Sequence, residues 1–380
     1  MKIFNLRTVT WLGVAVVAAG LLGTAGCSSS SSSSASPSAS PSAPAGTLSV
    51  KQIVLGSTQH LSQPDDIVTL GGNIWVGWQK GVGSMGEPAP SGNLDSALTE
   101  YTPSGHLVNS WKLKGKIDGM GADAAANQVI VTVNEDGNSS LYTVSSGGTV
   151  THYTYSPSPL PHLGGTDSVS VYQGKILIAA SAPGTGGKAP KNAPAVYVVT
   201  LSGGTATAKT AALAPFFAIN ASATAVNGTN AGQTVALALT DPDSTEIAPT
   251  NSAAFAGDFM LNSQGDLQLI FSDATGTNLK VLKLSQAVDD SAWATSASGT
   301  LYVTDSSANT IDALTGTFKP GTVYTAVAPC NANSAPAVCP VSGSATYGPN
   351  YLGTIDLKTG AVGKVTVVGP VAPKGMVFVP

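Results

Sequence analysis

A repeated cassette of strands, whose first four copies start about fifty residues apart, is the feature that most limits how this chain can fold. Each copy joins one or two polar, usually acidic residues to a short stretch of small and apolar residues, then a turn and a strand of branched and aromatic residues. The copies start at residues 64, 117, 166, 220, 289 and 373; the fourth is degenerate and the last is partial. Such a period is typical of a four-stranded sheet repeated around an axis.

Segments rich in β-branched and aromatic residues predict strands throughout the chain after residue 46. Gly-Gly, Asp-Gly and Ser-Gly turns separate them. The clearest strands are expected at residues 73–76, 129–133, 175–178, 196–199, 300–303 and 323–327. Helix is expected only locally, and residues 282–294 are the best candidate.

The repeat predicts an all-β fold, a β-propeller, over residues 47–380. In this fold, sheets pack radially around a central channel, and strands from the two ends of the chain complete one sheet. Residues 48–55 are expected to supply that closing outer strand. About 330 residues at this period predict six four-stranded blades. Seven blades remain the alternative, because residues 291–368 hold more strands than one blade needs.

The first copy carries a family resemblance. Residues 63–67 (Gln-Pro-Asp-Asp-Ile) and 72–76 (Gly-Asn-Ile-Trp-Val) resemble the Pro-Asp-Gly-Ile … Gly-Asn-Leu-Trp-Val cassette of NHL-type propellers, and residues 299–305 are similar. Asp66 stands where that family has glycine. The resemblance implies shape more than activity, since NHL-type propellers include binding scaffolds, lyases and lactonase relatives.

The N-terminus indicates export. Lys2 and Arg7 precede an apolar run at residues 11–22. This run of about a dozen residues is too short to span a bilayer and has the length of a signal-peptide core. Residues 1–26 are therefore expected to be a signal peptide.

The residues at the end of this run indicate a lipid anchor. Residues 21–27 (Leu-Leu-Gly-Thr-Ala-Gly-Cys) resemble the lipobox of bacterial lipoproteins, with Thr24 where leucine is usual. The resemblance implies lipid on Cys27 and attachment to the outer face of a bacterial membrane, in the cell envelope. An ordinary secretory signal cleaved nearby is the alternative. Residues 27–46, rich in Ser and Pro, are expected to be a solvated tether.

The charge of the chain argues against nucleic acid as a partner. Charged residues make up 10% of the sequence, the formal net charge is −4, and Arg7 is the only arginine. Recognition of nucleic acid depends on basic patches and on the bidentate contacts of arginine, and the sequence offers neither.

The other two cysteines are expected to pair with each other. An exported protein meets an oxidising compartment, so Cys330 and Cys339 are predicted to form a disulfide around residues 331–338. Free thiols or metal ligands are the alternative. The absence of histidine from that half of the sequence argues against zinc.

The repeated acids are the candidate site. Equivalent positions of a propeller lie around one end of the channel, so Asp65, Asp118, Asp167 and either Asp289 or Asp290 are expected to converge. A set of Asp65, Asp118, Asp167 and Asp290 would bind Ca²⁺ or Mg²⁺. The alternative is that each aspartate accepts backbone N–H bonds in its own turn and joins blade to blade.

Three further segments contain residues that could take part in chemistry. His162 lies in a loop before a repeat and is a ligand-binding candidate, with an exposed loop imidazole as the alternative. Trp78 is a candidate for the channel entrance, whereas Trp75 is expected in the core. Residues 241–246 hold three acids but lack the glycine and late glutamate of a calcium loop, so they are expected to be a solvated turn.

Together these features favour a lipid-anchored scaffold that binds a protein, glycan or small-molecule ligand at the cell envelope. The alternative is a divalent-metal-assisted hydrolase or lyase, lactonase-like, that uses the channel aspartates. The sequence leaves open whether the chain is an enzyme.

Overall fold

β-Strands provide nearly all the regular structure of residues 46–185, 188–203, 209–328 and 350–380, which are the residues that the computed structural model describes. One short 3-10 helix, η1 (Gly56–Gln59), is the exception in these ranges. No helix in this part of the chain is long and apolar enough to cross a membrane. The signal peptide, Cys27, Cys330 and Cys339 lie outside the described residues.

Two of the five hydrogen-bonded sheets have four strands each, all antiparallel. The first follows the chain in the order β2 (Pro64–Leu70), β3 (Asn73–Trp78), β4 (Asp95–Tyr101) and β5 (Leu107–Lys114). The second has the order β20 (Val288–Ala294), β23 (Thr322–Val327), β24 (Tyr351–Ile355) and β25 (Val362–Lys364).

The eight-stranded sheet consists of two antiparallel groups of four. One group is β6 (Ile117–Asp123), β7 (Gln128–Val133), β8 (Ser140–Ser145) and β9 (Val150–Ser156). The other is β10 (Val169–Tyr172), β11 (Lys175–Ala179), β12 (Pro194–Leu201) and β13 (Thr210–Ala218). A short parallel pairing of β9 with β13 joins their outer edges.

The six-stranded sheet is an antiparallel group of four with an added hairpin. The group is β16 (Pro242–Ile247), β17 (Phe259–Ser263), β18 (Gln268–Ser272) and β19 (Leu279–Lys283). The hairpin of β14 (Ser222–Ala225) and β15 (Thr234–Ala236) continues the sheet, with β14 parallel to β19.

The fifth sheet joins the two ends of the described chain. Its order is β27 (Met376–Val379), β21 (Thr300–Asp305), β22 (Thr310–Thr315), β1 (Leu48–Leu55) and β26 (Val367–Val368). Because β1 pairs with β22 and β27 with β21, the prediction that residues 48–55 supply a closing outer strand is confirmed.

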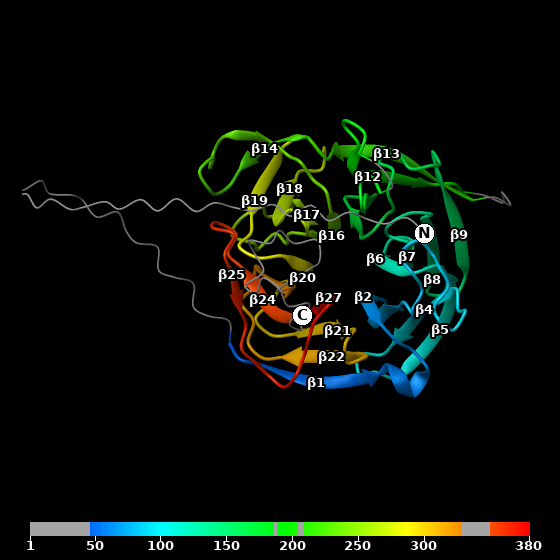
Figure 1. The fold of residues 1–380 in the computed structure, drawn as a ribbon. Helices are drawn as coiled ribbons and strands as arrows, with labels where there is room; N and C mark the ends of the chain where they lie inside the picture. Colours follow the sequence, from blue (N-terminus) through cyan, green and yellow to red (C-terminus); the bar gives the residue numbers. More distant parts are fainter. Residues whose placement is uncertain (1–45, 186–187, 204–208, 329–349) are drawn as a thin grey trace, which may run out of the picture. The chain divides into compact units, whose positions relative to one another are not determined.

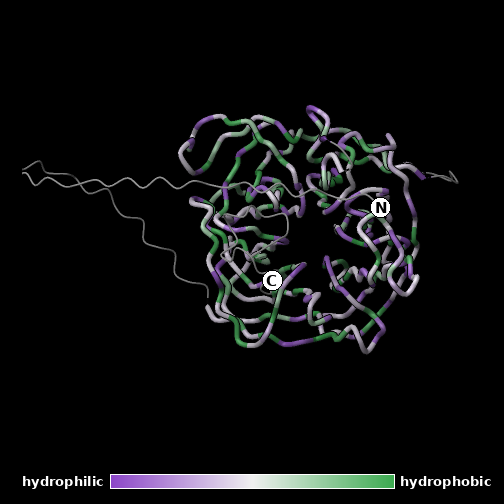
Figure 2. The backbone as a smooth tube through the Cα atoms, viewed as in Figure 1, coloured by the Kyte–Doolittle hydropathy of each residue, from purple (hydrophilic) through white to green (hydrophobic). Residues whose placement is uncertain are grey.

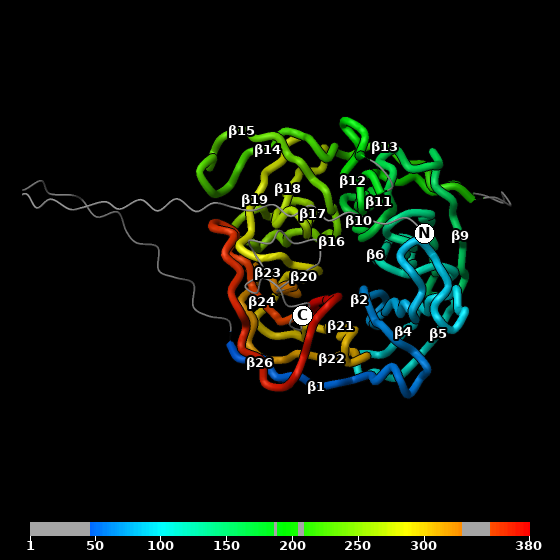
Figure 3. Tube along the Cα trace, viewed as in Figure 1, coloured from blue at the N-terminus to red at the C-terminus, as the bar shows by residue number. Residues whose placement is uncertain are grey.

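The groups are arranged around one centre (Figures 1 and 3). Their first strands contact one another in turn, β2 with β6, β6 with β10, β10 with β16, β16 with β20, and β20 with β27, which returns to β2. Hydrophobic clusters fill the space between neighbouring groups; in one, Trp75 and Leu98 pack against Val129 and Val131. This is the β-propeller that the repeat predicts. Since two groups share one sheet, the number of blades stays a prediction.

The side chains of the strands are partly or fully buried in most cases. Hydrophobic and hydrophilic residues are interspersed along the chain (Figure 2). Successive side chains of a strand point to opposite faces, and in β3, β7 and β21 every residue after the first is buried, so both faces of these strands are covered. The helix expected at residues 282–294 is wrong. That segment covers the end of β19 and all of β20, whose residues are almost all buried between neighbouring sheets, where branched and aromatic residues favour a strand.

The fourth copy of the repeat was misplaced. Residues 222–225 form β14 of the added hairpin, not a strand at the centre. The corresponding innermost strand is β16, about twenty residues later, because the hairpin is inserted before it. The solvated turn expected at residues 241–246 is therefore wrong as well, since most of it is β16.

Candidate functional site

A pair of residues outside the regular strand pairing lies at the start of each innermost strand, within the strand in four cases and directly before it in two. In β2 the register shifts between Pro64 and Ile67, at Asp65-Asp66. The same shift occurs at Asp118-Gly119 in β6, Asp243-Ser244 in β16 and Asp289-Asp290 in β20. Asp167-Ser168 and Lys374-Gly375 directly precede β10 and β27. Such a bulge changes the direction in which side chains point. Here the two residues of a pair have different roles: the first lines a cavity, and the second bonds to a neighbouring strand.

The first residues of these pairs line one cavity of about 40 Å³, which we call the channel mouth. Its lining includes Asp65, Asp118, Asp167, Asp243, Asp289 and Lys374, together with Asp66, Asp290 and Glu135. A water molecule needs roughly 10–15 Å³ of such space, so the enclosed part holds a few waters or an ion, not an organic ligand. The structure thus brings together the four aspartates proposed as metal ligands; their role stays a prediction.

The second residues of the pairs join neighbouring strands. Asp66 Oδ2 accepts a hydrogen bond from the N–H of Met120 at 2.5 Å. Ser168 Oγ accepts one from the N–H of Thr245 at 2.9 Å. The alternative reading of the repeated acids, that they join blade to blade, therefore describes the second position of a pair and not the first.

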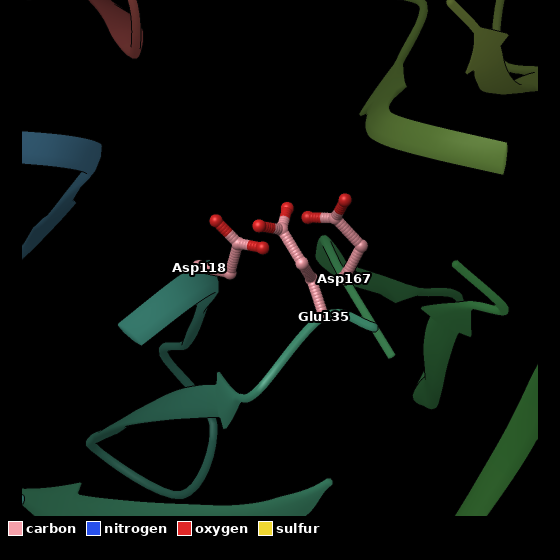
Figure 4. Close-up of side chains that lie close together, drawn as sticks. All are labelled: Asp118, Glu135 and Asp167. Atoms are coloured by element: carbon pink, nitrogen blue, oxygen red, sulfur yellow. The ribbon is translucent and has the colours of Figure 1, made fainter. Parts of the chain in front are cut away.

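Three carboxyl groups approach one another on one side of the channel mouth. Asp118 lies in β6, Glu135 follows β7, and Asp167 precedes β10. One oxygen atom of each lies within 4.8 Å of the others. Figure 4 shows the three carboxyl groups directed toward one another from separate segments. Asp118 and Asp167 are buried and Glu135 is partly buried, so water screens their repulsion poorly.

Lys116 compensates part of this negative charge. Its Nζ atom lies 3.5 Å from Asp118 Oδ1 and forms an ion pair with Glu135 Oε1. The other oxygen of Asp118, Oδ2, is buried and has no hydrogen-bond partner among the described residues. A buried carboxylate oxygen without a partner is costly, so this atom is the one most in need of a cation.

The electrostatics of the three acids follow from burial and from each other. Burial, with the nearby Glu135, raises the pKa of Asp118 well above its ordinary value. The same two causes raise the pKa of Asp167 to about 7. Burial also acts to raise the pKa of Glu135, but the adjacent Asp118 carboxyl group and the Lys116 ammonium outweigh it and bring that pKa to about 2. The cluster thus keeps a proton near neutral pH when no metal replaces it.

An ammonium group also lines the channel mouth. Lys374 Nζ lies 3.0 Å from Asp289 Oδ2 and 3.4 Å from Asp65 Oδ1. Asp290, named as a metal ligand from sequence, has its Oδ2 engaged 2.6 Å from the N–H of Met376. Of the four aspartates proposed as ligands, only Asp118 and Asp167 lie in the cluster of three.

His162 and Trp78 do not belong to the site. His162 is fully buried; its Nδ1 lies 2.7 Å from the Tyr197 hydroxyl and its Nε2 lies 2.6 Å from the carbonyl oxygen of Gly165. The exposed-loop alternative is therefore wrong, and the ligand-binding role of His162 stays a prediction away from the channel mouth. Trp78 is also fully buried, and its indole N–H donates to Thr99 Oγ1 at 2.9 Å, so its place at the entrance is wrong. Trp75 lies in the core as expected.

Sequence reasoning missed three residues of the channel mouth. Lys374 stands at the acidic position of the last, partial copy, so the repeat itself marked its place. Asp243 was missed because the fourth copy was placed at residue 220, whereas the corresponding innermost strand is β16. Glu135 follows β7 outside the repeated pair, and no sequence signal distinguished it from the Asp-Gly turn that begins at the next residue.

No protein-family model matches the chain, and no curated protein matches its sequence. Solved structures with a similar arrangement include a protein of unknown function from Bacteroides thetaiotaomicron, at 10% identity over 86% of this chain and 65% of that one, with a TM-score of 0.45. Another is a protein of unknown function from Bacteroides caccae, at 11% identity, 83% and 86% coverage, and a TM-score of 0.42. A third is virginiamycin B lyase from Staphylococcus aureus, at 9% identity, 71% and 99% coverage, and a TM-score of 0.31.

These similarities transfer no residue role and no activity to this chain, because identity and TM-score are both low. The fold is defined by the strand pairing of the chain itself. Fold and site together define a β-propeller whose channel mouth is lined by carboxyl groups and one ammonium group.

Proposed function

We propose that this chain is a lipid-anchored binding module of the bacterial cell envelope, an NHL-type β-propeller that holds a divalent cation at its channel mouth and meets its ligand there. The anchor is inferred from the lipobox resemblance of residues 21–27, and the tether at 27–46 gives the propeller freedom above the membrane. The observation that carries the binding role is the buried, unpartnered Asp118 Oδ2 beside Glu135 and Asp167.

The charge of the channel mouth favours a cation over other small ligands. Eight carboxyl groups and one ammonium group line the cavity. An anion would be repelled, and an apolar group would leave the carboxylates without partners. A cation at Asp118, Glu135 and Asp167 supplies positive charge where Lys116 supplies only part of it.

The geometry fits calcium. Ca²⁺ takes oxygen ligands at about 2.3–2.6 Å, so two oxygens on opposite sides of it lie about 4.6–5.2 Å apart. The three oxygens of the cluster lie within 4.8 Å of one another, so a shift of at most a few tenths of an ångström brings all three within reach of one such ion. Mg²⁺ binds at about 2.0–2.1 Å and demands a stricter geometry, so it requires more adjustment here. Ca²⁺ also accepts further oxygen ligands, which leaves coordination positions for a ligand of the binding module.

Thermal unfolding tests this function. The full chain, first stripped with EDTA, should gain about 2.7 kcal/mol of stability at a hundredfold excess of Ca²⁺ over its Kd. Asp118→Asn together with Glu135→Gln should abolish the gain. Asp258→Asn is the matched control, because Asp258 pairs with Lys280 outside the channel mouth. An unfolding curve that neither Ca²⁺ nor Mg²⁺ shifts would contradict the proposal.

A metal-assisted hydrolase or lyase is the second candidate, and one observation favours it. Asp243 lines the channel mouth outside the three proposed ligands, and burial raises its pKa well above its ordinary value, so it is suited to supply a proton near neutral pH. Ca²⁺-dependent turnover of lactone or ester substrates that disappears in Asp118→Asn would support the enzyme. Calcium binding without turnover of any lactone or ester substrate tested would exclude this enzyme and support the binding module.

A further inference from the structure

We infer that the channel mouth is built for two cations and that Lys374 is a resident cation that takes the place of one of them, so that the mouth takes up a single divalent cation from solution. This inference deepens the proposed function and rests on it. It starts from the repeat: five of the six equivalent first positions carry aspartate, and the sixth carries Lys374.

The neighbours of Lys374 in the ring are the two acids that it compensates. β27 lies beside β20 and β2, the strands that carry Asp289 and Asp65. Lys374 Nζ lies 3.0 and 3.3 Å from the two oxygens of Asp289 and 3.4 Å from Asp65 Oδ1. The ammonium therefore bridges two acids from two strands, as a bound metal ion would.

The surroundings of Asp65 require the positive charge of Lys374. Its side chain is 7% exposed, and its Oδ1 atom has no hydrogen-bond partner among the described residues. A buried carboxylate oxygen in this state requires a nearby positive charge. Lys374 provides it for Asp65, whereas Lys116 lies 3.5 Å from the Oδ1 atom of Asp118 and leaves Asp118 Oδ2 without a partner among the described residues.

The backbone fixes the ammonium at this place. The N–H of Lys374 donates to the carbonyl oxygen of Thr304 at 2.8 Å, and the N–H of Gly375 donates to Thr304 Oγ1 at 2.8 Å. A Cβ atom on Gly375 would lie 2.2 Å from the carbonyl oxygen of Asp65, so glycine permits the close approach of this segment to β2. The lysine thus starts from an anchored backbone next to its two acids.

The charge of Lys374 is permanent at physiological pH. Burial by itself lowers the pKa of Lys374, but Asp289 and Asp65 outweigh it and hold that pKa well above its ordinary value.

The ammonium nitrogen of Lys374 also lies close to the position that a calcium ion bound by Asp289 and Asp65 would take. Shortening its contacts of 3.0 and 3.4 Å to about 2.4 Å requires each carboxylate to move by only about 1 Å or less.

Calcium stoichiometry tests the inference. Isothermal titration of the EDTA-stripped full chain with CaCl₂ should give one ion for the wild type and two for Lys374→Met. Lys374→Arg keeps the charge and should give one. Lys280→Met is the matched control, because Lys280 also lies 3.0 Å from a carboxylate, Asp258, but away from the channel mouth, and it should give one. Circular dichroism establishes that each variant is folded, and Lys374→Gln, expected to bind two ions, replaces Lys374→Met if the latter does not fold.

The outcomes separate this inference from the proposed function. One ion in both the wild type and Lys374→Met overturns the resident-cation role and leaves the calcium-binding module in place. No ion in the wild type but one in Lys374→Met supports the role of Lys374 and removes the site at Asp118, Glu135 and Asp167. No ion in either protein overturns both.

Discussion

The Oδ2 atom of Asp290 lies 2.6 Å from the backbone N–H of Met376 and accepts its hydrogen bond, which joins β20 to β27. Asp66 makes the corresponding bond to Met120 and joins β2 to β6. Burial raises the pKa of Asp66 well above its ordinary value and that of Asp290 to about 7. These two acids join neighbouring strands although they lie among other buried carboxyl groups. Their hydrogen bonds to Met376 and Met120 therefore stabilise the fold most when the negative charge of the buried carboxyl groups is compensated.

We expect Asp290→Asn to stabilise the metal-free protein at pH 8 and to have little effect at pH 4. Because the folded pKa of about 7 exceeds the ordinary 3.8, the contribution of Asp290 to stability is present below about pH 4 and is lost as the pH rises through 7. Asparagine keeps an acceptor for Met376 without the charge. The gain at pH 8 should be about 2–4 kcal/mol, measured by urea unfolding in EDTA. An equal gain at both pH values would show that titration of Asp290 is not its cause.

Gly119→Ala should destabilise the propeller without touching the carboxyl groups. A Cβ atom at Gly119 would lie 2.3 Å from the carbonyl oxygen of Asp167 and 2.4 Å from Ser168 Cα, where two neighbouring innermost segments meet. Forced repacking of this kind costs about 1–3 kcal/mol. Gly363→Ala is the control, because its nearest neighbour would be 3.9 Å away. Equal melting temperatures for the two variants would refute the close approach.

His162 should make the protein less stable as the pH falls from about 6.5 to about 4. Burial lowers its pKa from 6.5 to about 4, so the unfolded chain takes up the proton first. The stability is therefore fully present above pH 6.5 and is lost as the pH falls through the folded pKa, by about 3 kcal/mol in total. His162→Gln should lack this slope, although it loses the contact with Tyr197. Parallel stability curves for the two proteins between pH 7 and 4 would contradict the assignment.

The fold was predictable because the repeat and the strand pattern point to the same arrangement. The β-branched and aromatic residues of β3, β7 and β21 identify strands, and residues 48–55 (β1) are expected from sequence to close the ring. The hairpin of β14 and β15 was not predictable in this way. Its small residues imitate an innermost strand, and only pairing with β19, a contact distant in sequence, shows where it lies.

The site was predictable only in part, for a physical reason. A repeat places equivalent residues around one axis, which brought Asp65, Asp118 and Asp167 together. It does not tell which residue of a bulged pair faces the channel, so Asp289 and Asp290 could not be separated. His162 is buried against Tyr197 of β12, to which it is hydrogen-bonded. The sequence of the loop around His162 does not indicate this contact with a strand distant in sequence.

Cys27 should carry the lipid that holds the propeller at the membrane. The wild-type chain is expected in the membrane fraction, and mass spectrometry of its N-terminal peptide should show a diacylated cysteine at residue 27. Two acyl chains bury enough CH₂ groups, at about 0.8 kcal/mol each, for stable anchoring. Cys27→Ser should carry no lipid, because the thioether cannot form. Cys330→Ser is the control: it removes a cysteine of the predicted disulfide with Cys339 and should stay membrane-bound. A soluble wild-type protein that begins at another residue would show that the N-terminus is an ordinary secretory signal.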